Sequence, residues 1–166
     1  MTKTNPIENL SRYLLLALPY AYALTIYDLL PQTLAVHFSL SNTVNGQLDK
    51  GLFLIGSLLL GFLIQGLMDW SLSRPGRITN ATFARVMRWL LPLVWPILIL
   101  AILWRNLNSS FPIGALTLYV VGALLLMVSN YLPKQVQAGR KPLPRGLAYG
   151  LVAVSLVILV WATFWL

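Results

Sequence analysis

Residues 51–70, GLFLIGSLLLGFLIQGLMDW, form an almost unbroken apolar run. A membrane-spanning helix needs about 20 consecutive residues of this kind. Further apolar blocks of similar length occur at residues 13–30, 89–104, 113–132 and 147–166. Together these blocks predict an all-α polytopic membrane helix bundle with about five transmembrane helices.

The composition agrees with a chain whose solvent is mostly lipid. Of the 166 residues, 58% are hydrophobic and only 10% are charged, whereas a soluble domain carries roughly a quarter of charged residues. The blocks use most of the sequence, so we expect one integral membrane domain over residues 1–166. Within it, residues 1–70 form a two-helix unit with an outer loop at 31–50, and residues 71–166 add three spans. The absence of cysteine excludes disulfides, thiol catalysis and cysteine-based metal sites.

Basic residues are concentrated in alternate connections between the apolar blocks. Only Lys50 and Arg105 fall on one side, whereas the other side carries Lys3, Arg12, Arg74, Arg77, Arg85, Arg88, Lys134, Arg140, Lys141 and Arg145. The positive-inside rule therefore predicts a cytoplasmic N-terminus and an outer C-terminus. The net charge of +8 would then face the anionic inner leaflet. Nucleic-acid binding is not expected, because the basic residues form no continuous patch with interleaved stacking aromatics.

A few polar side chains lie inside the spans and are candidate ligand contacts. They are Tyr20, Gln65 and Asn130. Hydrogen bonding between helices is the plainer interpretation of Tyr20 and Gln65. A small-ligand transporter or permease component is the alternative, with a polar cavity lined by these residues between a first and a third span that Pro19, Pro92 and Pro96 would bend.

Two pairs of small residues, four positions apart, allow close approach of helices. They are Ser57 with Gly61 and Gly146 with Gly150. Such pairs are typical of helix contacts in membranes. They leave open a structural accessory subunit of a membrane complex, or a homo-oligomer.

The outer loop contains the only histidine, His37. Pro31 ends the first span, and we expect Asn45-Gly46 to form a tight turn and Lys50 to reach the outer head groups. His37 could titrate near neutrality, bind a metal or contact an extracellular ligand. Asp28 and Asp49 are its possible partners, but one histidine with two carboxylates is not enough to predict a metal site. The candidate ligand-binding residues are His37, Phe38, Asn45 and Lys50.

An enzyme is not expected. The acidic residues are Glu8, Asp28, Asp49 and Asp69, and none of them falls at the centre of a span. No catalytic dyad, nucleophile elbow, phosphate loop or metal-ligand spacing occurs. The sequence therefore implies no cofactor, and it lacks the buried ionisable relay of proton-coupled transporters.

At the outer loop the chain resembles the two-helix domain of unknown function in Sdp-type toxin-immunity proteins. The shared elements are Leu30-Pro31, His37-Phe38, Asn45-Gly46 and Lys50, with Asn42 where a glycine is usual. A second segment, Ser129-Asn130-Tyr131-Leu132-Pro133-Lys134, is similar to the Gly-Asn-Tyr-Leu-Pro-Lys segment of the Sdp immunity family. Gly139-Arg140-Lys141-Pro142 is a reduced form of the motif that follows it there.

The resemblance implies a small multi-pass protein of the bacterial plasma membrane with an immunity or sensor-like role. Some such proteins protect the cell from a secreted antimicrobial peptide, and some hold a repressor at the membrane. The implied partners are the lipid bilayer, an extracellular peptide that meets the outer loop, and a cytoplasmic regulator.

Overall fold

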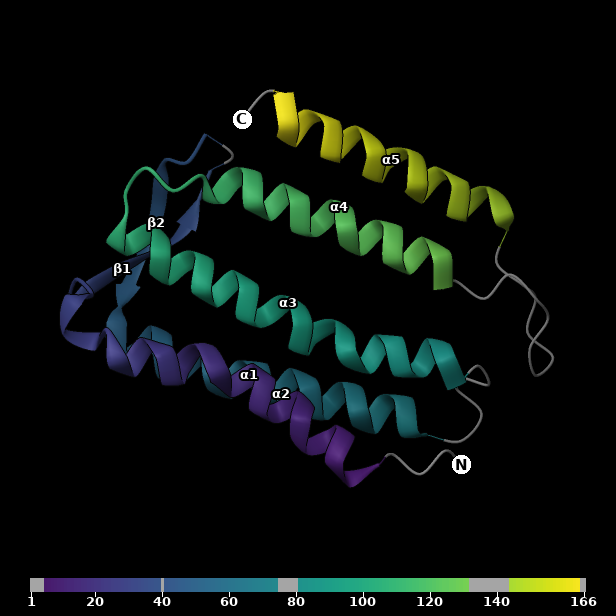
Figure 1. Cartoon of the computed structure of the whole chain (residues 1–166), viewed down its shortest axis with the longest axis horizontal. Helices are drawn as coiled ribbons and strands as arrows, with labels where there is room; N and C mark the ends of the chain where they lie inside the picture. Colours follow the sequence, from purple (N-terminus) through teal and green to yellow (C-terminus); the bar gives the residue numbers. More distant parts are fainter. Residues whose placement is uncertain (1–4, 40, 75–80, 132–143, 165–166) are drawn as a thin grey trace.

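The computed structural model describes residues 5–39, 41–74, 81–131 and 144–164. In this part of the chain five long helices lie side by side, and one β-hairpin lies at one end of the bundle (Figure 1). The elements are α1 (Pro6–Thr25), a 3-10 turn (Tyr27–Leu29), β1 (Thr33–Phe38), β2 (Val44–Asp49), α2 (Lys50–Ser73), α3 (Ala81–Leu107), α4 (Ile113–Tyr131) and α5 (Arg145–Phe164). The predicted all-α membrane bundle is confirmed, with the hairpin as its one departure.

Four of these helices, α2 to α5, are long and apolar enough to cross a membrane. The shortest of them has 19 residues, or about 28 Å at the rise of an α-helix. Helix α1 is not among them, because Glu8, Asn9 and Arg12 occupy its first two turns. It also begins earlier than the predicted block at residues 13–30. The reason is local: the side chain of Asn5 accepts a hydrogen bond from Ile7 N–H, and Pro6 occupies the first helical position.

The helices lie side by side with their axes along the same direction (Figure 1). Helices α1, α2 and α3 pack on one another, α4 packs on α3, and α5 packs on α4. Helices α4 and α5 approach closely at Gly122, whose carbonyl accepts a hydrogen bond from Ser155 Oγ at 2.7 Å. The main core lies nearer the hairpin, and its buried members are Tyr20, Ala23, Leu30, Leu34, Phe53, Leu54, Ile99 and Leu103.

The two ends of the molecule differ in their basic residues, as the sequence predicted. The starts of α1, α3 and α5 lie at one end, together with the last residues of α2 and α4 (Figure 1). We call this the inner end, after the predicted orientation, because it carries the described basic residues Arg12, Arg74, Arg85, Arg88 and Arg145. The hairpin and residues 108–112 lie at the opposite, outer end. The alternation on which the topology prediction depends is therefore present in the fold.

The outer segment is a hairpin, and its turn is not at the predicted place. The turn lies between β1 and β2, where Asn42 has a φ of 61° and Ser39 N–H donates to Thr43 O at 2.9 Å. Asn45-Gly46 lies within β2, so its assignment to a tight turn was wrong. Asn42 occupies the left-handed conformation because asparagine tolerates it better than most other residues.

Gly46 instead serves a close approach between the strands. It pairs with His37 at an irregularity in the register, and a Cβ atom on Gly46 would lie 2.9 Å from the His37 Cβ. A β-bulge of this kind needs a residue without a side chain at the crowded position.

The small-residue pairs have different surroundings. A Cβ on Gly61 would lie 2.9 Å from Trp95 Nε1, so this glycine lets α3 approach α2 within the chain. Gly146 and Gly150 have nothing within 4 Å of an added Cβ among the described residues. The Ser57/Gly61 pair is therefore used in the fold of one chain.

We expect Gly46→Ala to destabilise the hairpin by about 1–3 kcal/mol, the cost of overpacking a filled site. Gly56→Ala in α2 is the matched control, because its added Cβ meets nothing within 4 Å, and alanine favours a helix by up to about 1 kcal/mol over glycine. Hydrogen exchange of the strand amides measures both. Equal protection in the two variants would contradict the close contact with His37.

The orientation can be tested by cysteine labelling, because the chain contains no cysteine. We expect a membrane-impermeant maleimide to label Gln47→Cys, on the exposed hairpin, in intact cells. Thr82→Cys, in the first turn of α3, should be labelled only after permeabilisation. The reverse pattern would overturn the positive-inside assignment.

Candidate functional site

Two asparagine side chains hold the hairpin against the helices through hydrogen bonds to backbone N–H and C=O groups. Asn106 of α3 accepts from Ala35 N–H at 2.8 Å and donates to Ala35 O at 2.9 Å. The turn residue Asn42 accepts from Gly114 N–H of α4 at 2.9 Å through its side chain. Its carbonyl accepts from Arg105 Nη2 at 3.1 Å. The hairpin thereby has a defined position over the outer ends of α3 and α4.

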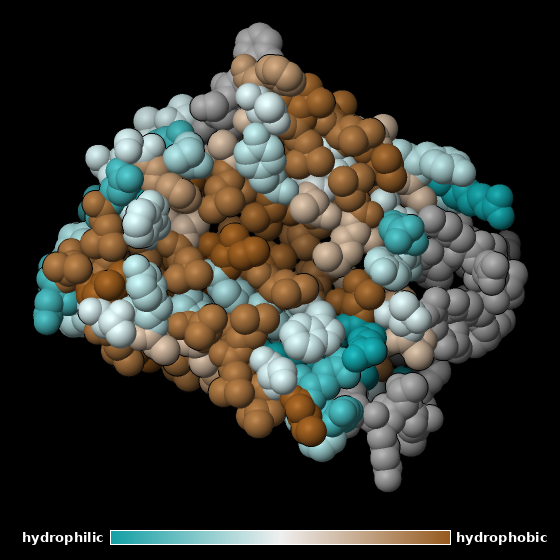
Figure 2. All heavy atoms as spheres, viewed as in Figure 1, coloured by the Kyte–Doolittle hydropathy of each residue, from teal (hydrophilic) through white to brown (hydrophobic). Residues whose placement is uncertain are grey.

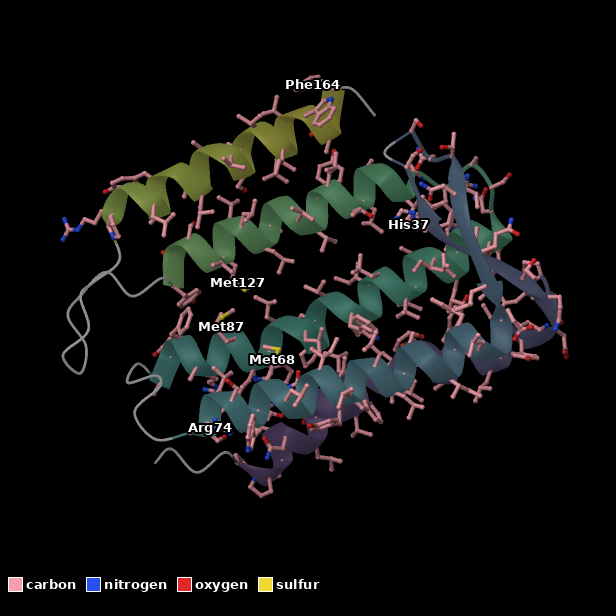
Figure 3. The ribbon with its side chains drawn as sticks, turned by 180° about the vertical axis from the view of Figure 1, so that it is seen from behind. His37, Met68, Arg74, Met87, Met127 and Phe164 are labelled. Carbon is pink, nitrogen blue, oxygen red and sulfur yellow. The ribbon has the colours of Figure 1, made fainter. Side chains whose placement is uncertain are left out.

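A pocket of about 270 Å³ lies between β1 and the helices, and we call it the hairpin pocket. Its walls come from three elements: β1 with the residue after it, α3, and the start of α4. They are Val36, His37, Phe38, Ser39, Leu98, Ala101, Ile102, Ile113, Gly114 and Thr117. Figure 3 shows His37 beside the outer end of α4, at the opposite end of the molecule from Arg74. Apolar walls with a few polar groups at the rim are typical of ligand pockets.

The structure brings three of the four predicted outer residues together. His37 and Phe38 line the hairpin pocket, and the side chain of Asn45 forms a hydrogen bond with His37 Nδ1. Lys50 lies elsewhere. Its Nζ donates to Tyr27 O at 3.1 Å and to Leu30 O at 3.3 Å, and it lies 4.2 Å from the centre of the Tyr27 ring. Lys50 therefore closes the junction of α1 and α2.

Asp49 also has a structural role, as the N-cap of α2. Its Oδ1 accepts from Gly51 N–H at 2.9 Å and from Leu52 N–H at 3.1 Å. The described residues contain no group of three histidine, aspartate or glutamate side chains that could hold a metal ion.

A second polar cluster lies between α1, α2 and α3 near the inner end. Asp69 Oδ1 is 2.6 Å from Arg12 Nη1 and 3.7 Å from Arg88 Nε. The side chain of Arg12 is fully buried, that of Arg88 is 8% exposed, and that of Asp69 is 22% exposed. We therefore correct the expectation that these two arginines face the inner leaflet, because a guanidinium this close to a carboxylate is kept inside the fold by the pair.

Gln65 joins this cluster to the backbone of α3. Pro92 has no N–H, so the carbonyl of Arg88, four residues earlier, has no donor within the helix. Gln65 Nε2 donates to that carbonyl at 3.1 Å and to Asp69 Oδ2 at 3.2 Å. Polar side chains of neighbouring helices satisfy such freed carbonyls in membranes. The interhelical bonding that the sequence favoured for Gln65 is present.

A further ion pair joins α1 to α3 at the inner surface. Trp89 Nε1 donates to Glu8 Oε1 at 2.8 Å, and Arg85 Nε lies 3.1 Å from the same oxygen. The hydrogen bond from Trp89 and the nearby Arg85 hold the pKa of Glu8 below its usual value. Glu8 lies in the first turn of α1, outside the candidate spans.

Tyr20 and Asn130 do not join Gln65 around a common cavity. The hydroxyl of Tyr20 donates to Ser57 Oγ at 3.0 Å and accepts from Trp95 Nε1 at 2.9 Å, so it links α1 to α2 and α3. Asn130 is exposed near the end of α4. None of the three lines the hairpin pocket.

A larger, apolar groove lies on the α3 face between α1 and α4, with a volume of about 640 Å³. It is lined by Leu18, Pro19, Tyr22, Ile97, Leu100, Ala101, Trp104, Phe111 and Leu116. Figure 2 shows a hollow among hydrophobic residues in the middle of this face. The groove has the character of the membrane interior, and the polar cavity predicted between the first and third spans is not what the described residues form there.

Residues 14–60 match the family model of a domain of unknown function, DUF1648. The matched segment runs from α1 through the hairpin into α2. It therefore includes His37, Phe38 and Lys50. The chain has no match among curated proteins or solved structures. The second segment of the family resemblance lies beyond the matched residues, and Leu132-Pro133-Lys134 and Gly139-Arg140-Lys141-Pro142 fall outside the described part of the chain.

The sequence did not reveal the roles of several residues. Arg105 was placed in an outer connection and Asn106 was not singled out, although both hold the hairpin. Arg12 and Arg88 were counted as surface charges. A usable signal existed for the arginines, because Asp69 lies at the same predicted membrane depth as both of them.

We expect Asp69→Asn to destabilise the protein by about 3–5 kcal/mol, because it leaves two buried guanidinium groups without their carboxylate. Asp28→Asn is the matched control, since Asp28 is exposed and surface changes usually stay within about 0.5 kcal/mol. Thermal unfolding of the purified protein in detergent measures both. A similar loss of stability in the two variants would show that the ion pairs of Asp69 with Arg12 and Arg88 do not stabilise the fold.

Proposed function

We propose that this integral membrane protein has an immunity or sensor-like role in the bacterial plasma membrane, and binds an extracellular amphipathic peptide at its hairpin. The observation that carries the proposal is the hairpin pocket. It has a volume of about 270 Å³ and lies at the outer end, beneath a hairpin whose position is fixed by Asn42, Arg105 and Asn106. A rigid support of this kind lowers the ordering cost of binding.

The surface around the pocket suits an amphipathic partner. Phe38 forms part of the wall, while Val44 and Leu48 of β2 are 44% and 37% exposed. His37, Asn45 and Gln47 lie among these apolar side chains. A peptide with one apolar and one polar face would find both kinds of contact on the hairpin.

The family resemblance supports the same proposal. Its outer motifs, Leu30-Pro31, His37-Phe38, Asn45-Gly46 and Lys50, all lie within the segment that matches DUF1648. We place the activity in binding, with no enzymatic step. A cytoplasmic regulator is the implied partner at the inner end, where Arg74 stacks over the Trp70 ring at 3.6 Å and Arg145 is exposed.

The apolar groove gives the transporter alternative its one favourable observation. Its walls include Pro19 of α1 and Trp104 of α3, so it lies between the two helices where a small ligand was predicted. With a volume of about 640 Å³ it would hold an apolar ligand. It remains the second candidate, because the lining offers few groups that could specify a substrate.

The proposal is tested by survival of a deletion strain, compared with its parent, across secreted antimicrobial peptides of related bacteria. We expect selective sensitivity to one peptide, rescued by the intact gene. His37→Ala should restore sensitivity at an unchanged protein level, because His37 lines the pocket. Asp28→Asn, exposed at the α1–α2 junction, should protect fully.

Equal survival of the deletion strain and its parent against every peptide would overturn the immunity role. Full protection by His37→Ala would mean that the hairpin is structural. In that case uptake or efflux of small apolar compounds would be the next measurement.

A further inference from the structure

The charges at the outer end are unevenly distributed around the hairpin pocket. The chain has four acidic residues, and Glu8 and Asp69 belong to the inner end. The other two, Asp28 and Asp49, lie at the junction of α1 and α2, where Asp49 caps α2. Arg105 lies on the other side of the outer end, with its Cζ atom 5.7 Å from the centre of the Phe38 ring. The pocket wall therefore adjoins a basic group.

The charge of Arg105 is not neutralised by a carboxylate among the described residues. Its Nη2 donates to Asn42 O at 3.1 Å, and its Nη1 donates to Ser109 O. Both acceptors are neutral carbonyls. Its Nε is buried and has no hydrogen-bond partner within the described residues. A partly buried guanidinium without a counter-charge favours an anionic group nearby.

Residues that contact Arg105 also line or adjoin the hairpin pocket. Phe38 lies against Arg105 and lines the pocket. Asn42 connects the two as well, because its carbonyl accepts from Arg105 while its side chain accepts from Gly114 N–H, a residue of the pocket lining. The pocket volume of about 270 Å³ lies below the ~300–1,000 Å³ of drug-sized sites. It offers room for one large side chain rather than for a long lipid chain.

Resting on the proposed peptide-binding function, we infer that the hairpin pocket binds the C-terminal residue of the peptide. The side chain of that residue is apolar and fills the pocket, and its terminal carboxylate faces Arg105. The hairpin pocket suits an apolar side chain, and Arg105 suits a carboxylate beside it. Capture of a peptide C-terminus by a local cluster of donors is a known mode of recognition.

The test uses the full-length protein in phosphatidylcholine nanodiscs and the probe N-acetyl-Leu-Phe, compared with its C-terminal amide. Fluorine NMR with 4-fluorophenylalanine in the probe measures both affinities. We expect the free acid to bind about fivefold tighter, the factor that a partly exposed ion pair supplies. Arg105→Gln should remove that difference. Arg85→Gln is the control, because the Arg85 side chain is 72% exposed at the inner end, and it should keep the difference.

Further comparisons separate the outcomes. Thr117→Phe, which fills the pocket, should abolish binding of both probes. Equal affinities of acid and amide for the unmodified protein would overturn the carboxylate assignment, a result that does not depend on how Arg105→Gln folds. If N-acetyl-Asp-Phe-amide binds as tightly as the free acid, a side-chain carboxylate is sufficient and the C-terminal assignment is wrong.

Failure of both probes to bind would overturn the inference as a whole. The proposed immunity role would still be decided by the survival experiment, which uses intact cells and whole peptides. The two failures are therefore distinguishable.

Discussion

The pairing of Asp69 with two buried arginines is the constraint on which the rest of the fold depends. Asp69 lies on α2, Arg12 on α1 and Arg88 on α3, so one carboxylate connects the three helices that form the core of the structure. Inside a membrane protein, apolar side chains gain little by meeting one another, since lipid is equally apolar. A charge cluster therefore decides which helix faces meet and at what height.

The remaining polar contacts of the bundle follow from this alignment. With α2 and α3 held at the level of Asp69, Gln65 reaches the carbonyl that Pro92 leaves without a donor. Further toward the outer end, Tyr20 meets Ser57 and Trp95. Each contact satisfies a group that would otherwise be unpaired in an apolar interior. Pro92 of α3 is tolerated because Gln65 of α2 supplies the missing donor.

At the outer end, hydrogen bonds of asparagine amides hold the hairpin to the helices, whereas ion pairs join the helices at the inner end. Asn106 presents a carbonyl and an N–H to the edge of β1, much as a neighbouring strand would, and Asn42 reaches the start of α4. The hairpin is thereby attached to α4 and to α3, and α3 is also held by the Asp69 cluster at the inner end. This arrangement places the hairpin pocket against α3 and α4 and leaves most of β2 exposed.

The sequence by itself determined the membrane class, the approximate position of the spans and the alternation of basic connections, because length and hydropathy are properties of contiguous residues. It also located the outer segment that carries His37 and Phe38. Only the tertiary structure decided that Arg12 and Arg88 are interior, that Asn45-Gly46 belongs to a strand, and that Arg105 and Asn106 belong to the hairpin site. These facts depend on residues far apart in the chain, such as Arg12 and Asp69 or Ala35 and Asn106. Local propensity has no access to them, because the partner that fixes each side chain comes from another helix.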